Sequence, residues 1–69
     1  MRLEDLLFAV NDDTMIEVLD NNTGEVLVEY TLNGDLSYTD YDDAEVMDIS
    51  IYIDAIYGNI LVICVDTEN

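Results

Sequence analysis

The first ten residues carry apolar side chains at helical spacing. These side chains recur at the i, i+3, i+4 and i+7 positions of one helix face: Leu3, Leu6, Leu7 and Val10. The polar residues 11–14 then break the pattern with side chains that favour turns. The pattern therefore predicts a short amphipathic helix that ends near Asn11.

Two segments after this helix follow the two-residue period of strands. Residues 15–20 and 25–32 alternate, and the second is the cleaner, with Val26, Val28 and Tyr30 on one face. The residues between them, 21–24, have the composition of a turn. We therefore expect the two segments to form a β-hairpin.

The second half of the chain contains two further strand patterns. In residues 44–53 Met47, Ile49, Ile51 and Ile53 alternate with polar positions, which predicts a strand with one buried and one wet face. Residues 60–65 are apolar at both parities, which predicts a central strand covered by the helix on one face and by long side chains or a partner subunit on the other. Turns are expected at 33–35 and 55–59, a loop over 36–43 and a polar tail over 66–69.

These patterns predict a single α+β domain over residues 1–69. A short N-terminal helix would pack on one face of a four-stranded, mainly antiparallel sheet. A chain of this length buries only about 60% of the surface that its unfolded form exposes, so its stability margin is thin. The apolar content of 51% and the absence of proline nevertheless favour a folded chain.

Charge is the outstanding feature of the composition. Seventeen Asp and Glu residues accompany one Arg and no Lys or His, which gives a formal net charge of −16 at pH 7. We expect nearly all of these carboxylates to be unpaired within the chain. Such a surface attracts cationic partners at low salt and repels nucleic acid and anionic membranes.

The residue types needed for catalysis are scarce. General bases and nucleophiles need partners that shift their pKa or accept their proton, and this chain has no His, no Lys and one Arg. The lone Cys64 lies in the apolar run and is interpreted as a core residue. We therefore expect neither enzymatic activity nor a cofactor.

Binding of calcium is an alternative use of the carboxylates. Four of them fall within six residues: Asp40, Asp42, Asp43 and Glu45. Their spacing is not that of an EF-hand loop, and solvated acidic loops are the simpler interpretation. We therefore predict no metal site and keep a calcium-binding module as a lesser alternative.

The sequence also bears on location. Glu4 and Asp5 interrupt any apolar segment of a signal peptide, and no apolar run approaches the roughly 20 residues of a membrane span. A single cysteine forms no internal disulfide, which fits a reducing compartment. We expect a cytoplasmic protein in a host cell, without a membrane partner.

Carboxylates and tyrosines together suggest a partner-binding surface. Same-face residues of a strand lie about 6.6 to 6.8 Å apart, so carboxylates repeated on strands and loops can meet successive Lys and Arg side chains of a DNA-binding groove. Exposed tyrosine adds contact area and stacks well on arginine, and Tyr38 and Tyr57 are further tyrosines of this kind. The predicted partner-binding residues are Glu25, Glu29, Asp40, Tyr41, Asp42, Asp43, Glu45, Asp48, Tyr52 and Asp54.

Several segments resemble known small proteins. The stretches LEDLL (3–7), DDTMIEV (12–18), TGE (23–25) and AEVMDIS (44–50) are similar to those of small proteins encoded in bacterial prophages. By size and charge alone, the chain also resembles the acidic phage-encoded inhibitors of host defence, including DNA-mimic anti-CRISPR proteins. Those inhibitors share no common motif, so this resemblance assigns no functional residue.

The resulting hypothesis is an inhibitory binding protein of the anti-CRISPR type. It would present a DNA-like carboxylate surface to the basic groove of a DNA-binding host protein, for instance a CRISPR effector subunit, as a monomer or small homo-oligomer. The alternative is a structural or assembly protein of a phage or mobile element, soluble because it is acidic, with strand 60–65 as an oligomer interface.

Overall fold

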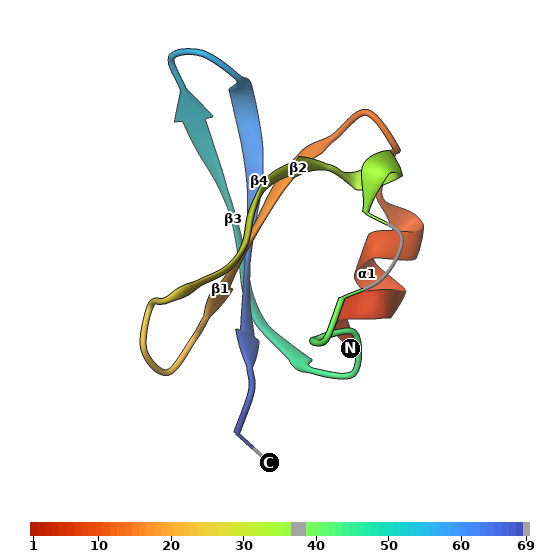
Figure 1. Cartoon of the computed structure of the whole chain (residues 1–69), viewed down its shortest axis with the longest axis vertical. Helices are drawn as coiled ribbons and strands as arrows, with labels where there is room; N and C mark the ends of the chain where they lie inside the picture. The colour runs from red at the N-terminus through yellow and green to blue at the C-terminus, as the bar shows by residue number, and fades with distance from the viewer. Residues whose placement is uncertain (37–38, 69) are drawn as a thin grey trace.

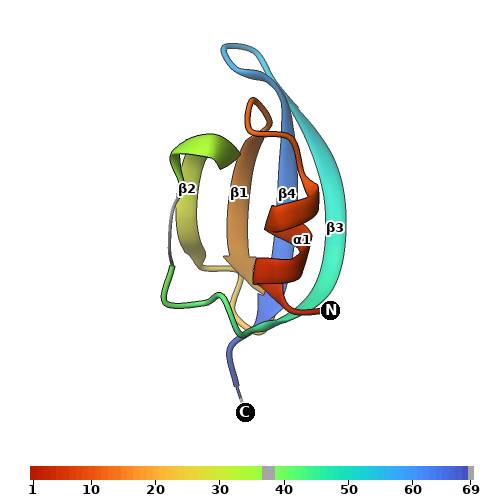
Figure 2. The same ribbon diagram turned by 90° about the vertical axis from the view of Figure 1, so that its right-hand side faces the viewer.

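A computed structural model describes residues 1–36 and 39–68 of the chain. The elements in chain order are α1 (Leu3–Ala9), β1 (Met15–Asp20), β2 (Val26–Leu32), the 3₁₀ turn η1 (Asn33–Asp35), β3 (Glu45–Asp54) and β4 (Gly58–Asp66). They form one four-stranded sheet with α1 on one face (Figures 1 and 2). The α+β class and the expected helix-on-sheet arrangement are therefore confirmed.

The sheet is mixed, with the strand order β2-β1-β4-β3. Two antiparallel hairpins, β1–β2 and β3–β4, lie side by side, and their inner strands β1 and β4 pair in parallel from Met15↔Ile60 to Asp20↔Val65. The predicted hairpin over 15–32 is confirmed. The parallel pairing was not predicted, because alternation along a strand does not reveal the direction of its neighbour.

The core lies between α1 and the sheet. Leu3 from the helix packs with Val18 of β1, Ala44 of the connection, and Ile63 and Val65 of β4. Because the hairpins meet at β1 and β4, these two strands supply most of the buried side chains. The predicted central position of strand 60–65 is confirmed.

Both edges of β4 are paired, and four of its residues are buried within the single chain: Ile60, Val62, Ile63 and Val65. On the face away from α1, the cross-strand neighbours of Ile60 are Met15 and Tyr52, so the chain's own long side chains flank it there. Strand β4 therefore has no free edge to offer, and an oligomer interface on this strand stays a prediction.

The predicted buried face of β3 is wrong. Met47, Ile49, Ile51 and Ile53 are all exposed, and the exposed fraction of Ile53 reaches 75%. β3 is an edge strand, and the hairpin that it forms with β4 projects beyond the helix (Figure 1). A helix of seven residues is about 10 Å long, so it cannot cover a strand of ten residues, about 33 Å.

The backbone of the β2–β3 connection caps the beginning of α1. The first N–H groups of a helix have no partner inside the helix. Here the Leu3 N–H donates to the Ala44 carbonyl at 2.9 Å and the Glu4 N–H donates to the Asp42 carbonyl at 3.0 Å. The acidic segment 39–44 thus holds the helix in place through its backbone as well as carrying charge.

The side chain of Asn33 caps the end of the helix. Its Nδ2 amide donates to the carbonyls of Leu7 at 2.8 Å and Val10 at 2.9 Å, and the residue is buried. Since a helix this short is unstable alone, these two bonds tie it to η1 and thereby to β2. No helix among residues 1–36 and 39–68 has the length and apolar content needed to cross a membrane.

Replacing Asn33→Asp should destabilise the fold. The carboxylate cannot donate to the Leu7 and Val10 carbonyls and puts a negative charge beside the negative end of the helix, at an expected cost of about 2 kcal/mol or more. Thermal unfolding followed by circular dichroism measures the effect. Asn21→Asp, at an exposed turn position, adds the same charge and should leave the melting temperature nearly unchanged; equal melting temperatures for both variants would contradict the capping role.

Candidate functional site

The sheet face opposite α1, here called the open face, carries polar and aromatic side chains. Val18 and Ile63 pack toward the helix, so their neighbours Glu17 and Val62 point to the other side. On β3 the residues that pair with open-face positions of β4 are Asp48, Ser50, Tyr52 and Asp54. The open face therefore combines carboxylates and tyrosines over an apolar floor.

A shallow groove of about 420 Å³ lies on the open face. Its lining comes from β1, β2 and the β3–β4 turn: Glu17, Val26, Glu29, Tyr30 and Tyr57. The rings of Tyr30 and Tyr57 meet edge to face, with centroids 5.5 Å apart and planes at 80°. Two carboxylates thus lie beside two aromatic rings on one surface.

The β3–β4 turn fixes the position of Tyr57. The Asp54 carboxylate accepts the backbone N–H groups of Ile56 at 2.9 Å and Tyr57 at 3.0 Å. Gly58 follows with a φ of 77°, a conformation that glycine adopts without strain. Asp54 therefore holds Tyr57 in position against Tyr30.

Negatively charged side chains surround Tyr30. Burial raises the pKa of its phenol above the ordinary value, and the carboxylates of Glu17 and Asp54 raise this pKa further. The phenol therefore stays protonated at neutral pH and is available as a hydrogen-bond donor. The same negative field favours a cation in the groove.

This groove is suited chemically to a guanidinium or ammonium group. Arginine stacks on tyrosine rings and forms charge-assisted hydrogen bonds to carboxylates. Among residues 1–36 and 39–68, no hydrogen bond or ion pair engages the carboxylates of Glu17 and Glu29. Both are therefore available to a partner.

The predicted partner-binding residues do not form one surface. Asp48, Tyr52 and Asp54 lie on the open face, and Glu29 lines the groove on the same face. Glu25 is exposed in the β1–β2 turn. The other five lie near the N-terminus of the helix: Asp40, Tyr41, Asp42, Asp43 and Glu45.

Much of this second group is engaged within the chain. The guanidinium of Arg2 lies 3.3 Å from Asp43, 2.7 Å from Glu4 and 3.8 Å from Asp5, and the N-terminal amine lies 3.1 Å from Glu45. These exposed pairs each stabilise the fold little, but they neutralise charge locally. The expectation that nearly all carboxylates are unpaired is therefore wrong at the end of the molecule that holds Arg2.

Two further members have structural contacts. The Asp42 carboxylate accepts the hydroxyl of Thr39 at 2.6 Å, and Tyr41 is half-buried against the core. Asp40 is exposed. Tyr38, also expected to be an exposed tyrosine, lies outside the described residues.

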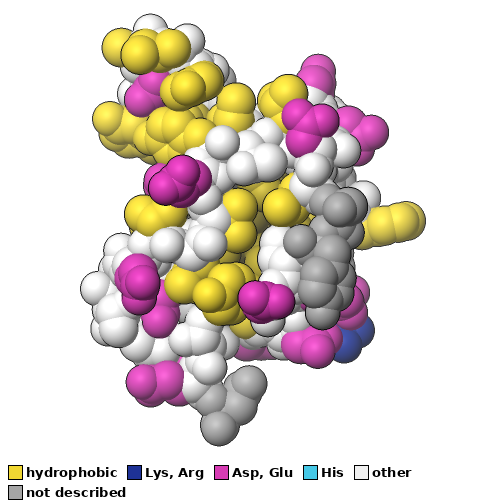
Figure 3. Space-filling model, in the orientation of Figure 1, with side chains coloured by type: hydrophobic (Ala, Val, Ile, Leu, Met, Phe, Trp, Pro, Cys, Tyr) yellow, Lys and Arg dark blue, Asp and Glu magenta, His cyan; other side chains and the backbone are white. Residues whose placement is uncertain are grey.

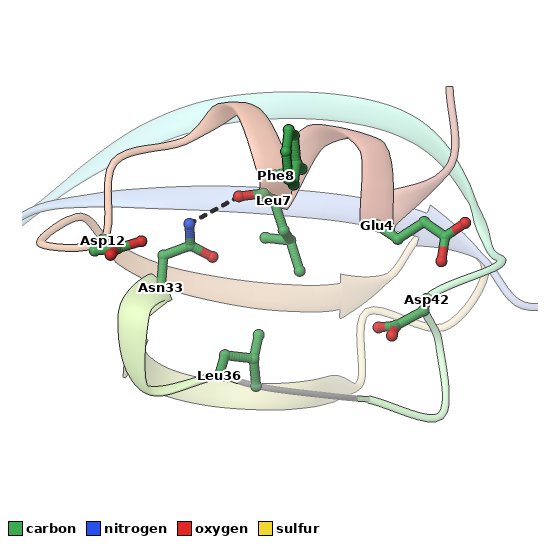
Figure 4. A pocket seen from close by; sticks show the side chains of 7 residues that line it. All are labelled: Glu4, Leu7, Phe8, Asp12, Asn33, Leu36 and Asp42. Carbon is green, nitrogen blue, oxygen red and sulfur yellow. Dashed lines mark hydrogen bonds between the residues drawn. The ribbon is translucent and has the colours of Figure 1, made fainter.

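A second hollow, of about 360 Å³, separates α1 from the β2–β3 connection (Figure 4). Leu7 and Leu36 point toward each other at its centre, Asp12 lies at one end, and Glu4 and Asp42 lie at the other. Its amide and two of its carboxylates already have partners, because Asn33 caps the helix, Asp42 binds Thr39 and Glu4 pairs with Arg2. We therefore assign the candidate site to the open face.

The described residues include no group of three or more carboxylate, thiol or imidazole side chains that could hold a metal ion. In the segment 40–45, Asp42, Asp43 and Glu45 already interact with Thr39, with Arg2 and with the N-terminal amine, respectively. The geometry therefore does not favour the calcium-binding alternative.

Cys64 lies on the open face and is half-buried. Burial raises the pKa of its thiol, and the carboxylate of Asp48, its partner on the neighbouring strand β3, raises this pKa further. The thiol is therefore protonated at neutral pH and is not activated as a nucleophile.

Sequence reasoning missed Glu17 and Tyr30 as site residues. In the sequence pattern Glu17 is one position of the strand 15–20, and Tyr30 only shares a strand face with Val26 and Val28. A β-bulge between Ile16 and Val18 in the pairing of β1 with β2 brings Tyr30 beside Glu17. Glu17 is the polar position inside the otherwise apolar segment 15–19, and this was the signal available in the sequence.

Comparison of this chain with protein-family models, with curated proteins and with solved structures found no match.

Replacing Glu17→Gln should lower the pKa of Tyr30 toward its ordinary value, because one of the two carboxylates that raise it is lost while burial remains. A ¹³C NMR titration of the tyrosine Cζ signals measures the midpoint. Glu25→Gln, outside the groove, should leave it unchanged.

The same shift predicts how stability depends on pH. The folded-state pKa of Tyr30 lies above the unfolded value of about 10, so the free energy of unfolding should fall as pH rises past that value.

For the first of these two predictions, a Tyr30 titration midpoint that does not change in the Glu17→Gln variant would contradict the placement of Glu17 beside Tyr30.

Proposed function

We propose that this protein is a binding module for a strongly basic protein surface. Arginine or lysine side chains of the partner enter the groove between Glu17, Glu29, Tyr30 and Tyr57 on the open face. The partner is a nucleic-acid-binding protein of the host cell, and binding excludes its DNA. A CRISPR effector subunit is the kind of target that the anti-CRISPR hypothesis specifies.

The observation that carries this proposal is the convergence of two carboxylates and two tyrosines. Glu17 and Glu29 have no partner among the described residues, and the rings of Tyr30 and Tyr57 are fixed edge to face. Fixed aromatic rings lose little entropy on binding, and carboxylates beside them select a cation. A surface of this kind can bind the cationic side chain of Arg or Lys.

The net charge of −16 supports the proposal over longer range. Such a field accelerates encounter with a cationic surface and falls with ionic strength. Asp48 and Asp54 extend the negative surface along β3, about 20 Å apart for six residues of strand. Duplex DNA carries a charge about every 1.7 Å of its axis, so these carboxylates are far sparser than phosphates. The arrangement therefore supports recognition of basic side chains more directly than it supports mimicry of the DNA backbone.

A first experiment measures binding of an oligo-arginine peptide by calorimetry over a series of salt concentrations. The double change Glu17→Gln and Glu29→Gln should weaken binding about tenfold, since each lost ion pair beside an aromatic ring contributes roughly 0.5 to 1 kcal/mol. Tyr57→Ala should weaken it further.

The matched control is the double change Asp13→Asn and Asp35→Asn. Both residues are exposed and lie outside the groove, so the control alters net charge equally without touching the site. Equal losses in the two double variants would show that only total charge matters and would overturn the groove as the binding site.

A second experiment tests competition with DNA. Purified host DNA-binding proteins, CRISPR effector complexes among them, are loaded with a fluorescent duplex, and displacement by this protein is followed by anisotropy. We expect salt-sensitive displacement by the parent chain and reduced displacement by the Glu17→Gln and Glu29→Gln variant. Peptide binding without displacement of DNA from any of these proteins would refute the DNA-competing role while leaving the cation-binding groove intact.

A further inference from the structure

The outer edge of β3 is open for most of its length. At its beginning, the Val46 N–H donates to the Met1 carbonyl at 2.8 Å, and the backbones of Arg2 and Glu45 form an isolated antiparallel β-bridge. From residue 47 to 54, the strand pairs with β4 alone within the described part of the chain. The outward N–H and C=O groups of this stretch are therefore available to another strand.

The usual protection of an edge strand is weak here. Natural edge strands are commonly short or carry Lys, Pro or bulges that prevent pairing with another chain. β3 has ten residues, and the whole chain contains neither Lys nor Pro. A register shift occurs between Val46 and Asp48, but from Asp48 to Asp54 the pairing with β4 is regular. Seven consecutive residues thus form a regular open edge.

The two faces of this edge differ in chemistry. On the helix side, Ile49, Ile51 and Ile53 are exposed by 43%, 62% and 75%. Ile56 in the adjoining turn is also exposed, and Figure 3 shows hydrophobic side chains gathered over the protruding end of the hairpin. On the open face, the positions alternating with these isoleucines are Asp48, Ser50, Tyr52 and Asp54.

A second copy of this chain is a poor occupant of the edge. Each copy carries a net charge of −16, so two copies repel each other. In an antiparallel pairing centred on Ile51, which matches isoleucine with isoleucine, Asp48 of one copy lies opposite Asp54 of the other on the same face. Charge complementarity instead favours a basic strand.

We propose that the β3 edge binds an extended segment of a basic protein whose side chains alternate between aliphatic and cationic. The aliphatic side chains cover Ile49, Ile51 and Ile53, and the Lys or Arg side chains align with Asp48, Tyr52 and Asp54. From the proposed function, this inference takes only the positive charge of the partner.

The two surfaces are continuous. Asp54 at the end of β3 fixes the turn that carries Tyr57, and the Tyr57 ring packs against Tyr30, so the end of β3 adjoins the groove. A strand added at the outer edge of β3 places its cationic side chains over the open face beside Asp48, Tyr52 and Asp54, on the same face as the groove. The backbone of the added strand provides affinity, and the alternating side chains provide specificity.

The test compares two peptides of identical composition and about nine residues, a length within the usual range of roughly three to ten residues for a strand. One alternates Lys with Ile or Val, and the other groups the lysines at one end. We expect the alternating peptide to bind about tenfold more tightly and to protect the amides of residues 47–53 from hydrogen exchange. Equal affinities, or protection confined to other segments, would overturn the inference.

Variants locate the effect on β3. Ile51→Thr with Ile53→Thr keeps β-forming residues at exposed positions but removes apolar contact, so it should abolish the preference for the alternating peptide. Asp48→Asn should weaken binding of this peptide more than the control Asp35→Asn, which follows the opposite edge strand. Retention of the full preference in the isoleucine variant would also overturn the inference.

Two measurements distinguish binding at the β3 edge from binding in the groove and from self-association. The ratio of the two peptide affinities reports on β3, whereas a loss common to both peptides in the Glu17→Gln and Glu29→Gln variant reports on the groove. Sedimentation of the free protein identifies self-pairing. A concentration-dependent dimer with residues 47–53 protected in the absence of peptide would make a second copy the occupant and overturn the proposal.

Discussion

The whole fold rests on the parallel pairing of β1 with β4. It joins two hairpins into one sheet, and it places the most apolar strand of the chain at the centre, where both of its edges are bonded. Val18 and Ile63 meet there beneath Leu3 of the helix. β2 and β3 are the edge strands, so the turns and the exposed isoleucines of β3 lie at the periphery of a small core.

That small core leaves much of the sheet uncovered. The seven-residue helix covers the centre of one face, and on the other face only side chains such as Met15 and Tyr52 flank the buried Ile60. Both surfaces discussed above result from this incomplete cover. The tyrosines gather where no helix packs, and the isoleucines of β3 are exposed where the helix ends too soon. A chain of 69 residues thus stabilises its fold while leaving apolar and aromatic groups accessible to a partner.

The carboxylates serve two different purposes. Some hold the backbone in place: Asp54 fixes the β3–β4 turn, and buried Asp20 accepts the Asn22 N–H at 2.8 Å, a bond that holds the pKa of Asp20 below its ordinary value. Others, such as Glu17 and Glu29, face solvent beside aromatic rings. Net charge alone therefore overstates the negative surface that is free to bind. The carboxylates available to a cation are those without a donor among residues 1–36 and 39–68.

Local sequence specifies the elements, because period and turn composition are local properties: residues 15–20 form the predicted strand, and the apolar run 60–65 lies in the central strand. It also determined the charge. Three features arise only when the strands assemble: the direction of β4 beside β1, the exposure of Ile49, Ile51 and Ile53, and the meeting of Glu17 with Tyr30 and Tyr57. These features depend on which strands become neighbours, and alternation specifies two faces of a strand without specifying what covers either of them.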